Sequence, residues 1–217
     1  MHIVLTLAAA EESTWLPLAR AALPAADIVL RPPDSPVDLR ARMADYALQS
    51  YPCTTLYREQ RSLRAAFALT AGVSWLLREP SLPPALPVIR LEDAGMTAQM
   101  TRYVEAAVLR VLLNLPAYVQ RQRKQVWQQN PPRLPATLTV GVLGLGVIGA
   151  AIAARLAADG YSVRGFAHSA KAVPGVACLH GDDQFPDFLT GLDVLVSVLP
   201  LTAANREIGR ASCRERV

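Results

Sequence analysis

Six residues, Gly144-Leu145-Gly146-Val147-Ile148-Gly149, place three glycines at the spacing Gly-x-Gly-x-x-Gly. An apolar run precedes them and an alanine-rich helical pattern follows, which predicts a strand, a turn and a helix. Gly144 would make the tight turn, Gly146 would let a pyrophosphate approach the backbone, and Gly149 would let the helix lie close to the strand. Since a helix starting near Val147 would point free N–H groups and its positive end at the turn, we predict that these six residues bind a dinucleotide phosphate. An ordinary tight turn is the alternative.

A second glycine turn, Thr70-Ala71-Gly72-Val73-Ser74-Trp75, follows the apolar run 65–69. Gly72 permits a sharp turn, and the residues after it can start a helix with free N–H groups. The pattern therefore offers a second place for an anion. A plain connection between two elements is the alternative.

The residues after the predicted strand 161–166 bear on the choice of dinucleotide. NAD-preferring folds of this type place Asp or Glu at the end of the second strand, where the carboxylate accepts hydrogen bonds from the ribose. Here the sequence is Ala167-His168-Ser169-Ala170-Lys171, without a carboxylate to repel a 2′-phosphate. Because His168, Ser169 and Lys171 could bond that phosphate, we predict NADP(H) as the preferred cofactor and NAD(H) as the second option. A solvated loop with an accidental charge is the alternative.

The elements that must position the second turn alternate between strand and helix. Apolar runs predict strands at 2–7, 27–30, 46–48, 65–69 and 88–91. Helical patterns lie between the first two runs and around 58–63. This alternation predicts an α/β fold with a parallel sheet.

The part that carries the glycine-rich turn begins near residue 95. We predict one long amphipathic helix over 97–115, a further helix beginning at Pro116, and a proline-rich linker over 130–135. After the strand that ends at the turn, further strands are predicted at 161–166, 176–179 and 193–198, with a short helix at 185–191. The expected domains are therefore 1–95 and 96–206, the second being the first half of a doubly wound parallel-sheet domain.

Composition excludes several classes of protein. At 217 residues and 52% hydrophobic content, the chain can bury one good core or two small ones. The longest uncharged stretch, 134–154, contains glycines and changes from strand to helix character, so it does not indicate a membrane span. Residues 3–10 have no Lys or Arg before them and are followed by Glu11 and Glu12. This arrangement favours an opening strand over a signal peptide and predicts a cytoplasmic protein.

Cysteine spacing and net charge argue against a disulfide-rich protein, a metal site and a nucleic-acid-binding protein. Cys53, Cys178 and Cys213 are odd in number and far apart, so we expect neither a disulfide framework nor a metal site. The formal charge of +4 is modest. The one dense basic cluster, Arg121, Arg123 and Lys124, lies in a helical pattern and indicates a solvated helix face rather than nucleic-acid binding.

Several separate motifs follow one another along the chain: Ala71-Gly72-Val73, Arg90-Leu91-Glu92-Asp93-Ala94-Gly95-Met96, Gln99-Met100, the glycine-rich turn, Pro174-Gly175-Val176 and Leu199-Pro200-Leu201-Thr202. Together they resemble the D-isomer-specific 2-hydroxyacid dehydrogenases, and most of all the glyoxylate/hydroxypyruvate reductase branch. The resemblance implies hydride transfer from a nicotinamide cofactor to a short 2-oxo acid, glyoxylate or hydroxypyruvate. It also implies a flavodoxin-like substrate domain, a Rossmann domain and a homodimer joined through the nucleotide domain.

The resemblance also assigns roles to particular residues. The N–H groups of Gly72 and Val73 would hold the substrate carboxylate, and Leu199, Pro200 and Thr202 would line the cofactor. The family's catalytic Arg, Glu and His follow the Leu199–Thr202 motif by more residues than this sequence contains, so none is assigned. We therefore expect the 217-residue chain alone to be inactive. His2, His168 and His180 match no catalytic motif.

The last residues differ from the family pattern. From Ile208 to Val217 the sequence shows no apolar periodicity and resembles a translated sequencing adapter. We therefore expect 207–217 to be a non-native tail on a truncated chain, with a natural truncated paralogue as the alternative. A non-catalytic dinucleotide-binding or regulatory module, or a related dehydrogenase for another 2-oxo acid, fits the same visible residues.

Overall fold

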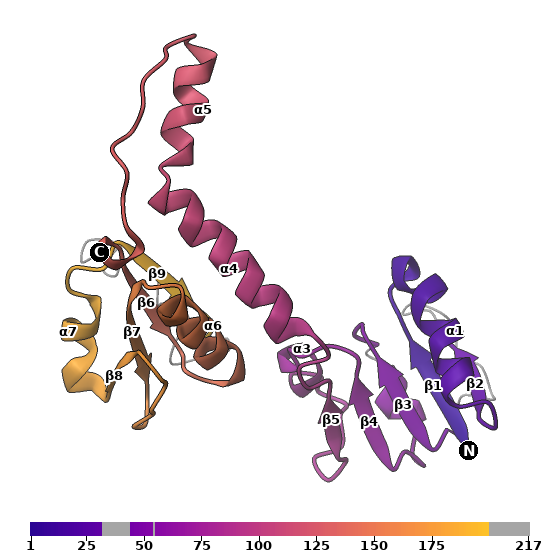
Figure 1. Ribbon diagram of the computed structural model, residues 1–217. Coiled ribbons are helices and arrows are strands. Elements are labelled where there is room, and N and C mark those ends of the chain that lie inside the picture. The colour runs from indigo at the N-terminus through magenta and orange to yellow at the C-terminus, as the bar shows by residue number, and fades with distance from the viewer. Residues whose placement is uncertain (32–43, 54, 200–217) are drawn as a thin grey trace. The chain divides into compact units, whose positions relative to one another are not determined.

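The computed structural model describes residues 1–31, 44–53 and 55–199. The chain divides into two compact units, one from Met1 to Asp93 and one from Ala94 onward (Figure 1). This division lies close to residue 95, where the sequence suggests a domain boundary. The expected non-native tail, 207–217, lies outside the described residues. Each unit has one parallel sheet with helices, which confirms the predicted α/β fold class.

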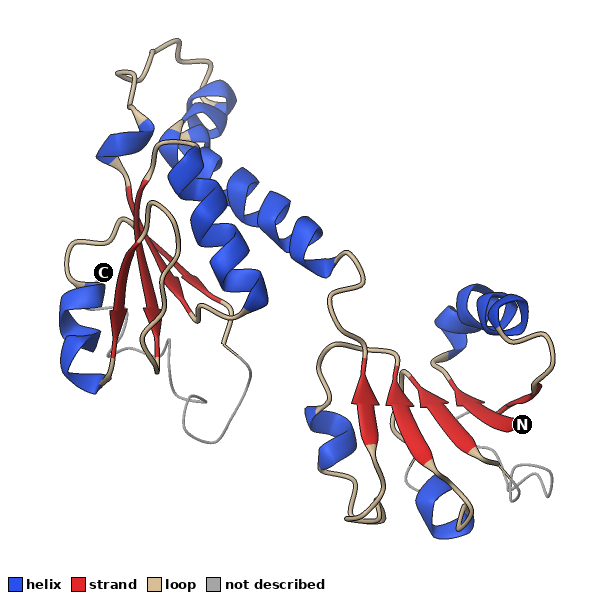
Figure 2. Cartoon of the chain, turned by 60° about the horizontal axis from the view of Figure 1, so that its bottom comes forward, coloured by secondary structure: helices blue, strands red, loops and turns tan. Residues whose placement is uncertain are grey.

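The first unit contains a five-stranded parallel sheet, drawn in red in Figure 2, in the order β2-β1-β3-β4-β5 (Figure 1). This is the flavodoxin-like order 2-1-3-4-5. The strands are β1 (His2–Thr6), β2 (Asp27–Leu30), β3 (Tyr46–Gln49), β4 (Ala65–Ala68) and β5 (Val88–Arg90). The helices are α1 (Glu12–Ala22), α2 (Leu56–Glu59) and α3 (Ser74–Leu77).

The core of the first unit lies under α2 and α3. Small apolar residues of β1, β3 and β4, namely Val4, Ala47, Ala66 and Ala68, pack there against Leu56, Tyr57 and Leu76. Their small volume lets the two short helices approach the sheet closely. Because crossover connections between parallel strands are right-handed, the step from β1 to β2 places α1 on the opposite face.

The second unit contains a four-stranded parallel sheet in the order β8-β7-β6-β9, which is the first half of a Rossmann fold. The strands are β6 (Thr139–Leu143), β7 (Ser162–Ala167), β8 (Ala177–His180) and β9 (Val194–Ser197). The helices are α4 (Met96–Leu112), α5 (Leu115–Arg123), α6 (Val147–Ala158) and α7 (Phe185–Leu189). The parallel registers of β6 with β7 and β9 bring three strand ends to one edge, where the glycine-rich turn lies.

Helix α4 belongs to the core of this unit. Val104, Val108 and Leu112 repeat every four residues and are buried with apolar residues of α6 and β6. Arg155 of α6 forms ion pairs with Glu105 of α4 and, at 3.2 Å, with Asp159. The hydrogen bond that Arg155 donates to the Glu105 carboxylate is the main reason that the pKa of Arg155 is raised. Apolar packing and charge therefore both fix α4 to the nucleotide unit.

Two predicted helices end at least three residues earlier in the structure. The helix expected at 58–63 is α2, which ends at Glu59 because Gln60 is buried and its side chain accepts a hydrogen bond from the N–H of Ala44. The helix expected at 97–115 ends at Leu112, since Asn114 adopts a left-handed conformation with φ of 50°. Asn tolerates that conformation better than most residues, and α5 begins directly after it with Pro116 in its first turn, as predicted.

No helix in the described ranges is long and apolar enough to cross a membrane. Cys53 is buried and Cys178 half-buried, and neither takes part in a disulfide. The third cysteine, Cys213, lies outside the described residues.

Candidate functional site

The glycine-rich turn joins β6 to α6 in a geometry that only glycine permits at two positions. Gly144 has a φ of +99° and donates its N–H to the carbonyl of Phe166 at 2.8 Å, so the turn is tied to the end of β7. A β-carbon on Gly149 would overlap the carbonyl oxygen of Gly144 and approach Val198 Cγ2 to 2.9 Å. The helix therefore lies against its own strand, as the sequence pattern predicts.

The outer side of the turn is open. A β-carbon on Gly146 would meet nothing within 4 Å, and Val147 is 74% exposed. Ala150 donates the first backbone hydrogen bond of α6, to Gly146, and no side chain caps the helix start. The N–H groups of the first helical turn are thus directed at open space, and a phosphate fits this donor set without a basic side chain.

The other predicted residues of the turn contribute differently. Leu145 is buried in the core of the unit, and Ile148 packs against that core. Their backbones lie in the turn, but their side chains face inward. Leu199 lies beside the turn, since its Cδ2 is 3.0 Å from where a β-carbon on Gly144 would be. Pro200 and Thr202 lie outside the described residues.

The residues predicted to choose the dinucleotide follow β7 directly. His168, Ser169 and Lys171 are all exposed. Because β7 is the neighbour of β6 in the sheet, they lie on the same carboxyl edge as the glycine-rich turn. In the segment from Ala167 to Lys171 there is no carboxylate. A 2′-phosphate would meet a cation and a hydroxyl there rather than an acid.

The turn after β4 carries the two residues expected to hold a carboxylate. Gly72 is exposed and a β-carbon on it would meet nothing within 4 Å, whereas Val73 is half-buried and immediately precedes α3. Sequence reasoning missed the side chains that brace this turn. Thr70 Oγ1 donates to the carbonyl of Gly72 at 2.9 Å and accepts from the indole nitrogen of Trp75 at 3.2 Å. A threonine hydroxyl beside a turn is a weak signal for such a brace.

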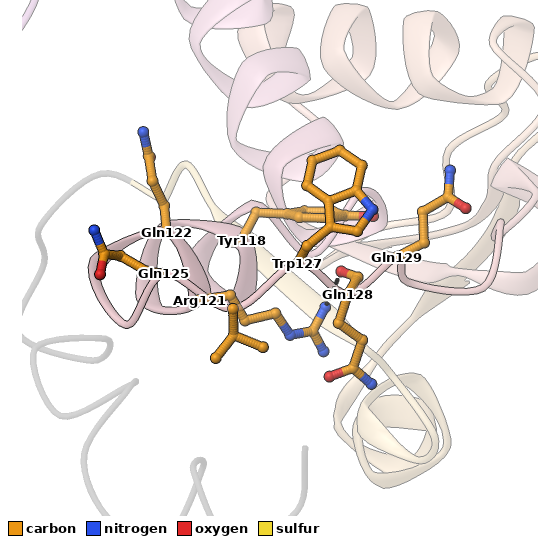
Figure 3. A pocket seen from close by; sticks show the side chains of 8 residues that line it. Tyr118, Arg121, Gln122, Gln125, Trp127, Gln128 and Gln129 are labelled. Atoms are coloured by element: carbon orange, nitrogen blue, oxygen red, sulfur yellow. Dashed lines mark hydrogen bonds between the residues drawn. The ribbon is translucent and has the colours of Figure 1, made fainter.

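A hollow of about 440 Å³ lies beside α5 and contains none of the predicted site residues (Figure 3). Arg121 stacks over the Tyr118 ring and donates to the Gln128 carbonyl at 3.0 Å and to Asn130 Oδ1. These contacts hold the chain that returns from α5, and they leave Trp127 96% exposed.

Among the described residues, no group of three or more His, Cys, Asp and Glu could hold a metal ion.

Comparison with known proteins identifies the second unit. Residues 106–213 match the family model described as the NAD-binding domain of D-isomer-specific 2-hydroxyacid dehydrogenases. Glyoxylate/hydroxypyruvate reductase A of Yersinia enterocolitica is 38% identical over 164 residues, which are 73% of this chain and 52% of that protein. The same enzyme of Photorhabdus laumondii is 38% identical over 170 residues, 76% of this chain and 54% of that protein. The chain thus spans about half the length of the curated relatives it matches.

Solved structures extend the likeness to both units. A D-isomer-specific 2-hydroxyacid dehydrogenase of Xanthobacter autotrophicus, in complex with NADPH, matches 99% of this chain and 69% of its own with a TM-score of 0.89 and 34% identity. An NADPH-dependent glyoxylate/hydroxypyruvate reductase of Sinorhizobium meliloti, with NADP bound, has a TM-score of 0.88 and 28% identity, over 100% of this chain and 67% of its own. Fold, glycine-rich turn and identity agree, and the chain belongs to the family of D-isomer-specific 2-hydroxyacid dehydrogenases.

Proposed function

We propose that the intact protein reduces glyoxylate and hydroxypyruvate with NADPH. One observation carries the proposal: the open side of the turn between Gly144 and Gly149 shares a strand edge with Ser169 and Lys171, and no acid lies between Ala167 and Lys171. Relatives named glyoxylate/hydroxypyruvate reductase A, at 35–38% identity, support the choice of substrate.

The second unit would hold the cofactor. The backbone of Gly144, Gly146 and the first turn of α6 would receive the pyrophosphate, because their N–H groups face open space. Ser169 and Lys171, with His168, would receive the 2′-phosphate, and Leu199 would line the same edge. When bound, NADPH supplies the hydride. The solved relatives that hold NADPH or NADP support this preference over NADH.

The first unit would hold the substrate carboxylate. The N–H groups of Gly72 and Val73 have no hydrogen-bond acceptor within the described part of the chain. A carboxylate bound by two backbone donors is fixed in orientation, which presents the neighbouring carbonyl carbon for reduction. Reduction leaves negative charge on the carbonyl oxygen, which requires a cation and a proton donor nearby.

The test is a kinetic assay of the intact gene product with glyoxylate and hydroxypyruvate. We expect turnover of both acids with NADPH. Turnover confined to lactate-like or phosphorylated 2-oxo acids would assign a related dehydrogenase instead. A folded protein that binds NADPH and reduces none of these acids would contradict the proposal and support the non-catalytic dinucleotide-binding or regulatory module.

We also propose that the intact protein is a homodimer joined through its nucleotide unit. While one side of α4 is buried against α6, its other side exposes apolar residues, and so does the segment that follows it. Exposed patches of this kind mark interaction surfaces. The residues are Tyr103, Leu109, Val111, Leu113, Leu115, Val119 and Trp127.

A further inference from the structure

The peptide bond between Gly72 and Val73 is held from one side by the brace described above. Thr70 Oγ1 donates to the Gly72 carbonyl at 2.9 Å, and its lone pair accepts from Trp75 Nε1 at 3.2 Å. The indole N–H fixes the direction of the hydroxyl proton, because an oxygen that accepts on one side donates on the other. The two hydrogen bonds therefore connect Trp75 to Gly72 through the Thr70 hydroxyl.

Core packing holds Trp75, the donor of the first of these hydrogen bonds, in place. Its ring packs against the core of the first unit, and the next residue, Leu76, is buried in that core. The Val73 carbonyl accepts hydrogen bonds from the N–H groups of Leu76 and Leu77, both at 3.0 Å. These bonds fix the peptide group that follows Val73. The turn is thus held by its flanking residues while the Gly72 position stays open to solvent.

The geometry of a trans peptide turns this brace into an orienting device. The carbonyl of Gly72 and the N–H of Val73 belong to one planar unit and point in opposite directions. Holding the carbonyl toward Thr70 therefore turns the Val73 N–H away from Thr70. No acceptor among the described residues occupies that N–H.

We propose that Thr70 and Trp75 are positioning residues that aim the Val73 N–H at the substrate carboxylate. The proposal rests on the proposed function, since it assumes that Gly72 and Val73 bind that carboxylate. The hydroxyl of Thr70, rather than the volume of its side chain, then determines the affinity of the turn for the substrate carboxylate. Without this brace, the turn would lose conformational entropy when the acid binds. That loss weakens binding although every contact to the acid remains.

The test uses the 217-residue chain and oxamate, a 2-oxo acid analogue that is not reduced, with the Gly72 and Val73 amide signals followed by NMR. We expect oxamate to shift both signals in the native chain. Thr70→Val, which keeps the shape and removes the hydroxyl, should weaken oxamate binding by about 3- to 10-fold, the range for one net hydrogen bond. Thr70→Ser should restore binding to within about 2-fold. Trp75→Phe, which removes the N–H donor together with part of the ring that packs on the core, should weaken oxamate binding in the same direction as Thr70→Val.

Ser62→Ala is the matched control, because Ser62 Oγ donates to the Ala44 carbonyl at 3.0 Å just before β4, at the strand end opposite Thr70. It should leave oxamate binding unchanged. Equal affinity of the native chain and Thr70→Val would overturn the positioning role and leave the carboxylate site intact, and so would a Thr70→Ser variant as weak as Thr70→Val. Absence of any shift at Gly72 and Val73 in the native chain would overturn the carboxylate site itself and the positioning role with it. If Thr70→Val does not fold, the comparison of Trp75→Phe with Ser62→Ala decides.

Discussion

The carbonyl oxygen of Gly144 occupies the place that a β-carbon on Gly149 would take. Gly149→Ala must therefore shift backbone against backbone, and we expect it to cost about 1–3 kcal/mol of stability, as overpacking does. Thermal unfolding of the 217-residue chain measures this loss. An unchanged midpoint would show that α6 can move away from β6 freely.

Gly146→Ala should behave in the opposite way. The new methyl group meets nothing within 4 Å and the backbone at Gly146 is extended, so stability should stay within about 1 kcal/mol of the native chain. NADPH binding should weaken about 10-fold or more, because the methyl would stand where the pyrophosphate approaches. Calorimetric titration measures the affinity. Native affinity in this variant would exclude the turn as the phosphate site.

Lys171→Ala should affect one dinucleotide and spare the other. Since the exposed Lys171 is proposed to pair with the 2′-phosphate, its loss should weaken NADPH binding about 3- to 10-fold and leave NADH binding unchanged. Lys124→Ala, at the end of α5, is the control with the same change of charge. Equal losses for NADPH and NADH would mean that Lys171 acts only through general charge.

Tyr57 should make stability fall at alkaline pH. Burial, followed by the charge of Glu79, raises the pKa of Tyr57 in the folded protein above its ordinary value of 10.0. Above pH 10 the unfolded chain therefore loses the phenol proton while the folded chain keeps it, so stability drops as pH rises. Denaturant unfolding at pH 8 and above measures how stability depends on pH in the native chain, in Tyr57→Phe and in a control, Tyr103→Phe, which changes an exposed tyrosine of α4. Only Tyr57→Phe should show a flatter fall of stability with rising pH. Identical slopes would refute this assignment.

The same substitution should also lower stability near neutral pH. The Tyr57 hydroxyl donates to the buried side-chain oxygen of Gln49. Removing the donor leaves that oxygen without a partner, at a cost of about 1–3 kcal/mol. Tyr103→Phe should cost nothing measurable, since Tyr103 is 71% exposed.

Leu109→Glu should weaken self-association through α4. The residue is exposed and lies on α4 away from the buried face of Val104 and Val108, so a charge there should leave the protomer folded. In sedimentation the intact protein should shift from dimer toward monomer. Leu18→Glu on α1, an exposed leucine of the first unit, is the control and should remain dimeric. A native protein that is monomeric would refute the dimer.

The nucleotide unit could be predicted from sequence because its signals are local. The glycine spacing requires a strand before it and a helix after it, and both β6 and α6 lie where the pattern places them. The strand order β8-β7-β6-β9 is that of the Rossmann half-domain which the glycine spacing indicates. The end of α2 could not be predicted, since it depends on the buried Gln60 side chain reaching Ala44 across the fold.

The hydrogen bonds that brace the turn after β4 could not be predicted either. Whether Thr70 bonds Gly72, and whether Trp75 reaches Thr70, depends on the rotamers that core packing imposes on the indole ring. Turn chemistry alone allows many partners for a threonine. The motif Ala71-Gly72-Val73 thus indicates which residues we propose to bind the substrate, but it does not indicate what orients them.

We propose that this chain binds NADPH on the open side of the turn from Gly144 to Gly149. Calorimetric titration of the 217-residue chain with NADPH and with NADH tests this proposal. We predict saturable binding of one NADPH per chain, with weaker binding of NADH. No binding of NADPH by the folded chain would refute this binding site, and tighter binding of NADH would refute the preference for NADPH.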